Sequence, residues 1–215
     1  AETDTIENMN KTAEWMQANL PGDATVAFIH NDYKYDNLVL DPDNLNNIIA
    51  VLDWEMATVG DPLMDLGATL AYWFEAGEAS VFKIYNLSWL PGNLSRQQLV
   101  DHYAKATGRD LSEILFYYVF GLFKNAVIAQ QIYHRFVQGN SNDPRFGALL
   151  PMIQLLGAKA AAAIAPVVEA KADAVDQRAG VPALPSADPA PESITFDAPE
   201  ETPAVTDEPA AELSD

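Results

Sequence analysis

The alternation of apolar and polar positions in the first quarter of the chain predicts one helix and three short strands. Apolar residues return to one face over residues 6–20, as in an amphipathic helix, and the Pro-Gly pair at 21–22 ends that pattern. A short apolar run at 26–29 predicts the first strand. Two more β-type runs, at 37–40 and 48–52, flank a turn rich in Pro, Asn and Asp, so we expect them to form a β-hairpin.

The pattern after residue 60 predicts helices. The Gly-Asp-Pro sequence at 60–62 is typical of a helix start, because Asp can cap free amides and Pro fits the first turn. We expect this helix to reach about Gly77. Ser95 and Gln98 have the spacing of a capping box and predict a second helix that stops near Gly108.

Asp110 and Glu113 repeat the capping-box spacing before a long helix, which is expected to run to about Gln138. Its first half is apolar on most sides, as in the buried central helix of a helical domain. A last helical region at 143–168 is expected to be interrupted by Pro151. The expected fold class is therefore α+β, predominantly α, with a small β element followed by several packed helices.

Composition divides the chain into two regions. The 215 residues are 49% hydrophobic with a formal net charge of -19, but positions 171–215 alone hold eleven acids, two bases and seven of the 14 prolines. Such a segment has little apolar surface to offset the entropy lost on ordering. We therefore expect a folded domain at 1–169 and an acidic, Pro/Ala-rich disordered tail at 170–215.

Charge and the length of the apolar runs exclude several classes of protein. A strongly negative chain without a Lys/Arg cluster is a poor partner for nucleic acid, and the absence of cysteine excludes disulfides and thiol chemistry. No basic region precedes an apolar run near the start, so no secretory signal is predicted. The longest apolar run, at 114–123, is shorter than the roughly 20 residues of a membrane span. These features predict a soluble cytoplasmic protein with no membrane partner.

Six carboxylates lie within residues 28–55, among β-forming apolar residues where an unpaired buried carboxylate is unfavourable. Antiparallel pairing in the expected hairpin places Asn37 opposite residues 50–52, with Asp53 leaving the second strand beside it. Cross-strand neighbours are roughly 5 Å apart, so the amide oxygen of Asn37 and the carboxylate of Asp53 could share one cation. Hard oxygen ligands of this kind suit Mg²⁺. Asp32 lies on the preceding loop, near the same end of the hairpin.

Residues 30–37 read His-Asn-Asp-x-x-x-x-Asn, which is the spacing of the kinase catalytic loop. With FIHNDYKYDNLVLD (28–41), IAVLDWE (49–55) and GDPLMDLG (60–67) in this order, the chain resembles the aminoglycoside phosphotransferase family, which has the protein-kinase-like fold. The segment FGLFKNAVIAQQIYHRFVQG (120–139) is similar to the branch related to the kinase-like domains found with acyl-CoA dehydrogenases.

This resemblance implies a small-molecule kinase, built on the C-terminal lobe of the kinase-like fold with the β-hairpin bearing the site. ATP would give its γ-phosphate to a hydroxyl of a small-molecule substrate. Asp32 would be the catalytic base, and Asn37 and Asp53 would be the Mg²⁺ ligands. Many family members have Gly where this chain has Asn31, although His-Asn-Asp also occurs in choline-kinase-like members.

Four other residues are candidates for supporting roles. His30 is expected to be a hydrogen-bonded scaffold for the loop rather than a proton carrier. Asp65, one turn into its helix, could brace the loop through a hydrogen bond, and the helix N-terminus favours its ionised form. Lys34 could touch a phosphate or be a solvated loop lysine. Glu55 could reach a second metal or point to solvent.

One departure from the family pattern concerns the nucleotide. Kinases of this fold hold the ATP phosphates with a lysine and a loop of an N-terminal lobe. Only 31 residues precede Asp32, and they contain one lysine, Lys11, and one glycine, Gly22. We therefore expect a C-terminal lobe, as a fragment, a split gene product or a truncated form, that needs a separate N-terminal lobe and by itself binds ATP weakly.

Two other functions remain open from the sequence. The chain could be a non-catalytic interaction module, in which the kinase-like lobe or the acidic tail binds a protein partner. It could also be a Mg²⁺-dependent phosphohydrolase with Asp32 as the nucleophile, although nothing in the sequence supplies the other parts of such a site.

Overall fold

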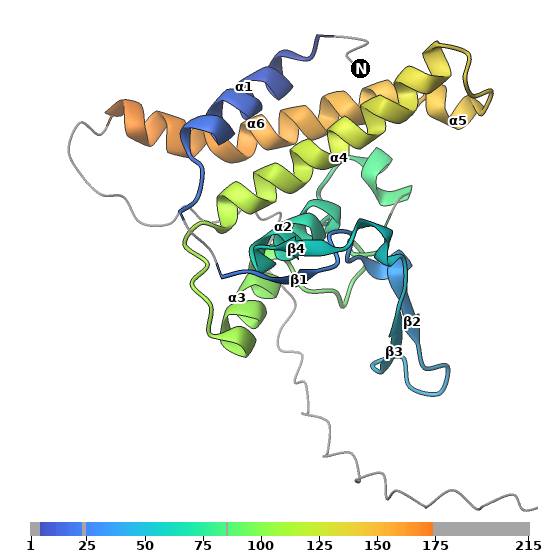
Figure 1. Ribbon diagram of the computed structural model, residues 1–215, viewed down its shortest axis with the longest axis vertical. Helices are drawn as coiled ribbons and strands as arrows, with labels where there is room; N and C mark the ends of the chain where they lie inside the picture. Colours follow the sequence, from blue (N-terminus) through green and yellow to red (C-terminus); the bar gives the residue numbers. More distant parts are fainter. Residues whose placement is uncertain (1–4, 23–24, 85, 174–215) are drawn as a thin grey trace, which may run out of the picture.

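The computed structural model describes residues 5–22, 25–84 and 86–173, so all but the first four residues of the predicted tail lie outside the described part. The helices are α1 (Glu7–Ala18), α2 (Pro62–Tyr72), α3 (Arg96–Thr107), α4 (Ile114–Val137), α5 (Pro144–Gly147) and α6 (Leu149–Asp173). The strands are β1 (Ala27–Ile29), β2 (Leu38–Leu40), β3 (Ile48–Val51) and β4 (Thr58–Gly60), with short 3₁₀ turns at Tyr35–Asn37, Trp54–Met56 and Ser80–Ile84. The chain is thus a mostly helical α+β protein with small sheets, as Figure 1 shows.

The strands form two separate antiparallel pairs, β1 with β4 and β2 with β3. The predicted hairpin is present: Leu38 lies opposite Val51 and Val39 opposite Ala50, before a bulge shifts the pairing at Leu40. Strand β4 was not predicted. Its pairing with β1 joins the two ends of the segment that carries the acidic residues, and both strands lie below α4 and α6 in Figure 1.

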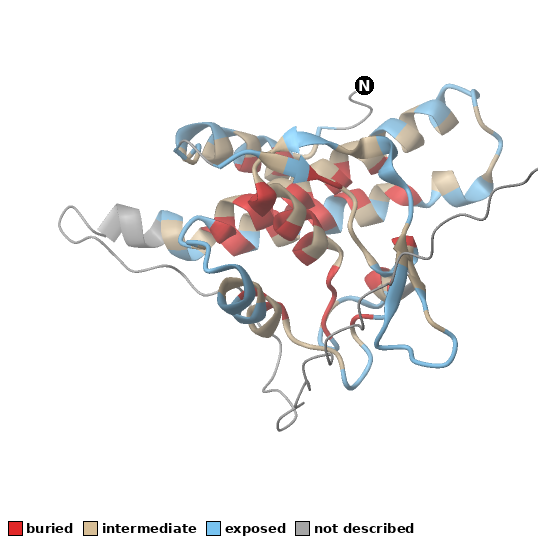
Figure 2. Ribbon diagram, turned by 60° about the horizontal axis from the view of Figure 1, so that its bottom comes forward, coloured by how far each residue is buried: buried red, intermediate tan, exposed pale blue. Residues whose placement is uncertain are grey.

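The hydrophobic core lies between the helices. Helix α4 packs against α2 on one side and α6 on another, and α1 rests on both α4 and α6. The buried residues gather on these helices, as the red segments of Figure 2 show. Leu70, Tyr118, Leu122 and Ile153 are fully buried. The prediction that the long helix is the buried centre of a helical domain is confirmed.

Two glycines allow α2 and α4 to approach each other closely. A Cβ atom added to Gly121 would lie 2.5 Å from the carbonyl oxygen of Gly67 and 2.9 Å from the Cβ of Ala71. Real Cβ atoms do not come so near to backbone oxygen, so only glycine fits at this crossing. Gly67 is equally constrained by the backbone of Tyr117. The two helices are therefore held at a fixed distance and register.

The start of α2 is as predicted, but its end is not. Asp61 caps the helix by accepting a hydrogen bond from the Leu63 amide (2.9 Å), and Pro62 occupies the first turn. The helix ends at Tyr72 instead of reaching Gly77. The backbone groups beyond this point find other partners, because the amide of Phe74 donates to the Ser88 hydroxyl (2.8 Å). Tertiary hydrogen bonds thus end the helix one turn early.

The capping box at Asp110 and Glu113 was a wrong prediction. Asp110 instead accepts a hydrogen bond from the Ser112 amide (2.9 Å), which makes a tight turn, and α4 begins only at Ile114. The capping box of Ser95 and Gln98 is present as predicted. The two sites have the same residue spacing, so the difference lies in the backbone that surrounds them.

Pro151 does not interrupt the last helical region. It lies in the first turn of α6, where its missing amide has no helical acceptor, and the break comes at Ala148 between α5 and α6. By length and mean hydropathy (1.5), the stretch Leu149–Val168 could cross a membrane. Composition alone does not separate a membrane span from a core helix, and Ile153, Leu156 and Ile164 on α6 belong to the core that α4 shares.

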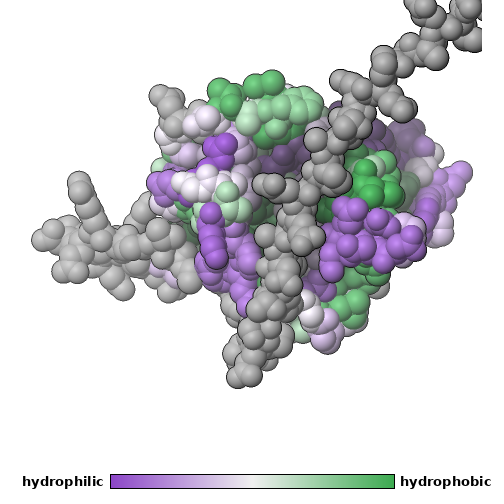
Figure 3. All heavy atoms as spheres, turned by 90° about the horizontal axis from the view of Figure 1, so that it is seen from below, coloured by the Kyte–Doolittle hydropathy of each residue, from purple (hydrophilic) through white to green (hydrophobic). Residues whose placement is uncertain are grey.

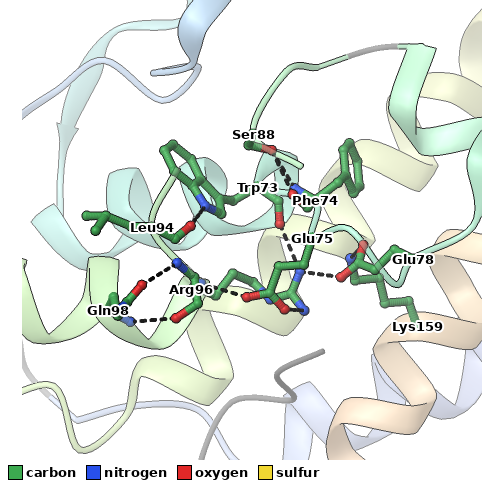
Figure 4. A network of polar contacts seen from close by, with 10 residues as sticks. Trp73, Phe74, Glu75, Glu78, Ser88, Leu94, Arg96, Gln98 and Lys159 are labelled. Atoms are coloured by element: carbon green, nitrogen blue, oxygen red, sulfur yellow. Dashed lines mark hydrogen bonds and ion pairs between the residues drawn. The ribbon is translucent and has the colours of Figure 1, made fainter. Parts of the chain in front are cut away.

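A buried group of charges ties three parts of the helical region together (Figure 4). Arg96, at the start of α3, pairs with Glu75 (2.9 Å) and with Glu78, both in the segment after α2. Lys159 of α6 also pairs with Glu78. The guanidinium of Arg96 donates in addition to the carbonyl of Trp73 (2.8 Å). The charges thereby hold the segment after α2 against α3 and α6.

Candidate active site

The loop after β1 carries the His-Asn-Asp sequence, and a carboxylate of α2 holds its backbone. The amide of His30 donates to Oδ2 of Asp65 (2.7 Å), and the amide of Asn31 donates to Oδ1 of the same carboxylate. Asp65 lies in the first turn of α2, where the helix N-terminus favours a negative charge. One side chain thus satisfies two neighbouring loop amides and fixes the entry to Asp32.

The His30 ring links this loop to the end of the hairpin. It is buried, with 4% of its surface exposed, and its Nδ1 accepts a hydrogen bond from the Asp32 amide (3.2 Å). Because Nδ1 accepts, the proton resides on Nε2, which donates to the carbonyl of Leu52 (2.7 Å). Both ring nitrogens are therefore occupied by backbone groups, an arrangement that suits a scaffold.

Asn31 adopts a backbone conformation that few residues tolerate. Its φ of 68° is in the left-handed region, which glycine and asparagine enter more readily than other residues. The left-handed conformation is stabilised from α4, because Nζ of Lys124 donates hydrogen bonds to the Asn31 carbonyl (2.5 Å) and to the Asn31 Oδ1 (3.3 Å).

Asp32 and Asn37 are brought into direct contact. Nδ2 of Asn37 donates to the backbone carbonyl of Asp32 (2.8 Å) and to its carboxylate Oδ2 (3.1 Å). Lys34 forms an ion pair with the same Oδ2 (2.7 Å). The Asp32 side chain remains 13% exposed, so the carboxylate is oriented by its neighbours and can still be reached from outside.

Asp53 follows the strand that pairs with Asn37. The Leu52 amide donates to the Asn37 carbonyl (2.8 Å), so the hairpin register continues to the residue before Asp53. Asp53 is exposed and has a φ of 66°, the second non-glycine residue with positive φ in the described ranges. Backbone strain of this kind is often found at functional sites.

The donor atoms at this end of the hairpin fit Mg²⁺. Because Nδ2 of Asn37 is bonded to Asp32, its Oδ1 is the atom left for a cation, and Asp53 adds a carboxylate. The described residues contain no cluster of three or more His, Cys, Asp or Glu side chains around one point. Mg²⁺ needs no such cluster, since it is commonly held by one or two protein groups together with substrate phosphates.

The four supporting candidates differ in where the structure places them. His30, Lys34 and Asp65 all contact the loop, as described above, whereas Glu55 is exposed on the 3₁₀ turn after Asp53. Lys34 also lies over the ring of Tyr72, 4.8 Å from its centroid. The catalytic and metal-binding roles inferred from the sequence stay predictions.

Two residues near the loop were not singled out from the sequence. Burial lowers the pKa of Lys124, with Lys34 acting in the same direction and Asp32 and Asp65 in the opposite one. Burial likewise raises the pKa of the Tyr72 hydroxyl, and the nearby Asp32 carboxylate adds to this. The signal for Lys124 was present in the sequence, because it is the one cation in the apolar first half of α4.

Comparison with known proteins shows which family and fold this part of the chain is similar to. The phosphotransferase enzyme family matches residues 1–102, which include the loop, the hairpin and α2. In a crystal structure, a Ralstonia eutropha JMP134 protein assigned as an aminoglycoside phosphotransferase superposes with a TM-score of 0.67 and 25% identity, over 77% of this chain and 51% of that one. Residues 1–102 therefore match the phosphotransferase enzyme family, whose kinases use ATP.

Several similar proteins are named as members of the acyl-CoA dehydrogenase family. Acyl-CoA dehydrogenase family member 11 of Gallus gallus is 32% identical over 165 residues, or 74% of this chain and 21% of that protein. The Homo sapiens protein of the same name is 34% identical, over 64% and 18%. Family member 10 of Mus musculus is 30% identical, over 66% and 14%. The chain thus spans about a fifth or less of these relatives, and the resemblance to their branch is confirmed.

Proposed function

We propose that this chain is the catalytic lobe of an ATP-dependent phosphotransferase that moves the γ-phosphate to a hydroxyl of a small molecule. The observation that carries the proposal is the contact of Asn37 with Asp32 at 2.8 and 3.1 Å, at the end of the hairpin that leads to Asp53. One amide thereby connects the proton acceptor to the oxygen ligands expected for the metal.

The chemistry follows from the position of Asp32. The acceptor hydroxyl donates its hydrogen bond to the Asp32 carboxylate, and its oxygen forms a bond to the γ-phosphorus as the bond to the bridging oxygen of ATP breaks. Asp32 takes the hydroxyl proton, and ADP leaves. Mg²⁺, when bound at Asn37 and Asp53, would neutralise charge on the phosphates. Lys34, which is paired with Asp32, would keep the carboxylate oriented and would be the cation nearest to it for the transferred phosphoryl group.

The surface beside Asp53 supports a role for a second lobe. Phe28 is 68% exposed and stacks on Trp54, the residue after Asp53, with ring centroids 5.7 Å apart. Val59, opposite Phe28 on β4, is also exposed, as is Ile49 on β3 of the other sheet. Figure 3, which shows the molecule from below, has apolar areas among hydrophilic ones. We propose that an N-terminal, nucleotide-holding lobe packs on this surface.

The test uses the chain combined with a candidate N-terminal lobe, mixed or joined to it, with ATP-dependent phosphorylation of an alcohol as the readout. Asp32→Asn should leave Mg-ATP binding intact and abolish transfer. Asp53→Ala should abolish Mg-ATP binding, as calorimetry would measure. Asp43→Asn, at an exposed acid in the hairpin turn, is the matched control and should change neither.

The same experiment tests the alternative of an interaction module. Full transfer by both the Asp32 and the Asp53 variant would contradict the proposed site. Tight binding of a lobe or another protein partner, with no transfer and no Mg-ATP binding, would favour the module. The observation that favours an interaction module is the set of exposed apolar residues around Trp54.

A further inference from the structure

A large cavity lies in the helical region. It has a volume of about 590 Å³ and is bounded by α4, α5 and α6 together with the end of α2. This volume is in the range of small-molecule sites. Its wall is nearly all hydrocarbon, and the side chains that form most of it are Ile128, Ile132, Phe146, Met152 and Leu156.

Tyr72 connects this cavity to Asp32. The tyrosine lines the cavity from the last position of α2, and Lys34, which is paired with Asp32, lies over its ring. The Asp32 carboxylate lies close enough to contribute to the raised pKa of the Tyr72 hydroxyl. A ligand in the cavity would therefore contact Tyr72, whose other neighbours include Lys34 and Asp32.

The polar groups of the wall limit what the cavity can hold. No carboxylate is among its described lining residues, and its one cation, Arg145, is paired with Asp143 (2.6 Å). Asn125 is 8% exposed, and its Oδ1 has no hydrogen-bond partner among the described residues. Because this oxygen is itself fully buried, it is not open to a ligand, and the cavity wall offers a ligand mainly hydrocarbon.

We propose that this cavity binds the body of the acceptor, and that the acceptor is an uncharged alcohol with a mainly hydrocarbon body. The assignment rests on the proposed phosphotransferase function and adds the substrate class to it. A polycationic aminoglycoside is excluded from this cavity, because burying several ammonium groups against hydrocarbon without a carboxylate is strongly unfavourable.

The test measures binding to the full chain by calorimetry without ATP, with 1-octanol as the alcohol probe and kanamycin as the polycationic probe. Ala148→Trp places an indole in the cavity from an exposed position, and Met152→Trp does so from α6. Ala158→Trp is the control, because Ala158 is exposed on α6 and does not line the cavity. Circular dichroism and thermal unfolding of each variant verify that it is folded.

We expect 1-octanol to bind the parent chain and Ala158→Trp alike, and to bind the two filled variants at least tenfold more weakly. Kanamycin should not displace 1-octanol from the parent chain. Equal 1-octanol binding by the parent and both filled variants, or kanamycin binding that the filled variants lose, would overturn the assignment.

The outcome is independent of phosphate transfer. Binding is measured without ATP, and neither Asp32 nor Asn37 is among the described residues that line the cavity. If the chain completed with an N-terminal lobe transfers no phosphate to any alcohol, the proposed function fails while the location of alcohol binding is unchanged. If transfer occurs but only to polycations, the substrate class is wrong and the phosphotransferase function stands.

Discussion

Lys124, in the middle of α4, donates a hydrogen bond from Nζ to the backbone carbonyl of Asn31, 2.5 Å away on the loop after β1. A helix of the core thereby reaches the residue next to the predicted base. Asp65 of α2 holds the amide of the same residue. The peptide groups on both sides of Asn31 are fixed by opposite charges from two helices, which explains how a left-handed conformation persists there.

Replacing Lys124 tests how much this support contributes. Lys124→Met keeps an unbranched apolar stem but leaves the Asn31 carbonyl without its charged donor. We expect the free energy of unfolding to fall by about 1–2 kcal/mol, since bonds to charged groups are among the stronger ones and the cost of burying the ammonium offsets part of the gain. Urea denaturation measures it. Lys105→Met, at an exposed position of α3, is the control, and an equal loss in both variants would contradict the expectation.

Asp65 should tolerate even a conservative change poorly. Asp65→Asn has one acceptor oxygen for the two amides of His30 and Asn31, so one amide loses its partner. We expect a loss of about 1–3 kcal/mol in the free energy of unfolding. Faster hydrogen exchange should be confined to these two amides. Asp101→Asn, exposed on α3, should have a negligible effect, and unchanged exchange in Asp65→Asn would show that the carboxylate does not hold the loop.

The crossing of α2 and α4 makes Gly121 difficult to replace. Alanine in a helix interior gains about 1 kcal/mol over glycine in propensity, so a net loss can arise only from the clash with Gly67. We expect Gly121→Ala to be destabilised by about 1–3 kcal/mol, as in other overpacked cores. Thermal unfolding measures this. Gly22→Ala is the matched control, because its added Cβ meets nothing within 4 Å. If Gly121→Ala melted at the same temperature as the parent, the two helices would be able to move apart at no cost in stability, and the expectation would be wrong.

The buried charges around Arg96 predict a pH dependence. Burial, aided by the charge of Arg96, lowers the pKa of Lys159 to about 8 from a usual value of 10.5. Between these two values the unfolded chain holds the proton that the folded chain has released, so the contribution of this group to stability rises with pH and then levels off. We expect the free energy of unfolding of the parent, minus that of Lys159→Met, to rise by about 3 kcal/mol across this window.

The difference between the two proteins is the quantity to follow, because other groups titrate in the same range. Burial raises the pKa of Tyr118, for example, which lowers stability above about pH 10 in both proteins alike. Chemical denaturation at several pH values from 7 to 10.5 supplies the data. A difference that is flat or falls with rising pH would contradict the buried position of Lys159.

Helix ends show where reasoning from sequence was insufficient. The capping residues Asp61 and Ser95 could be identified because they bond to amides only two or three residues away. The end of α2 could not, because it depends on Glu75 and Trp73 bonding to Arg96, about twenty residues later in the chain. Asp110 had the right spacing for a cap but was taken up by a turn to Ser112.

The sequence by itself determined the arrangement of Asp32, Asn37 and the strand leading to Asp53, because a short loop and a hairpin leave the backbone few alternatives over 22 residues. Only the tertiary structure decided that Lys124, 93 residues away from Asn31, supports the loop, and that Tyr72 joins Asp32 to an apolar cavity. Local geometry follows from turn chemistry and strand periodicity, whereas contacts between distant helices depend on how the whole core packs.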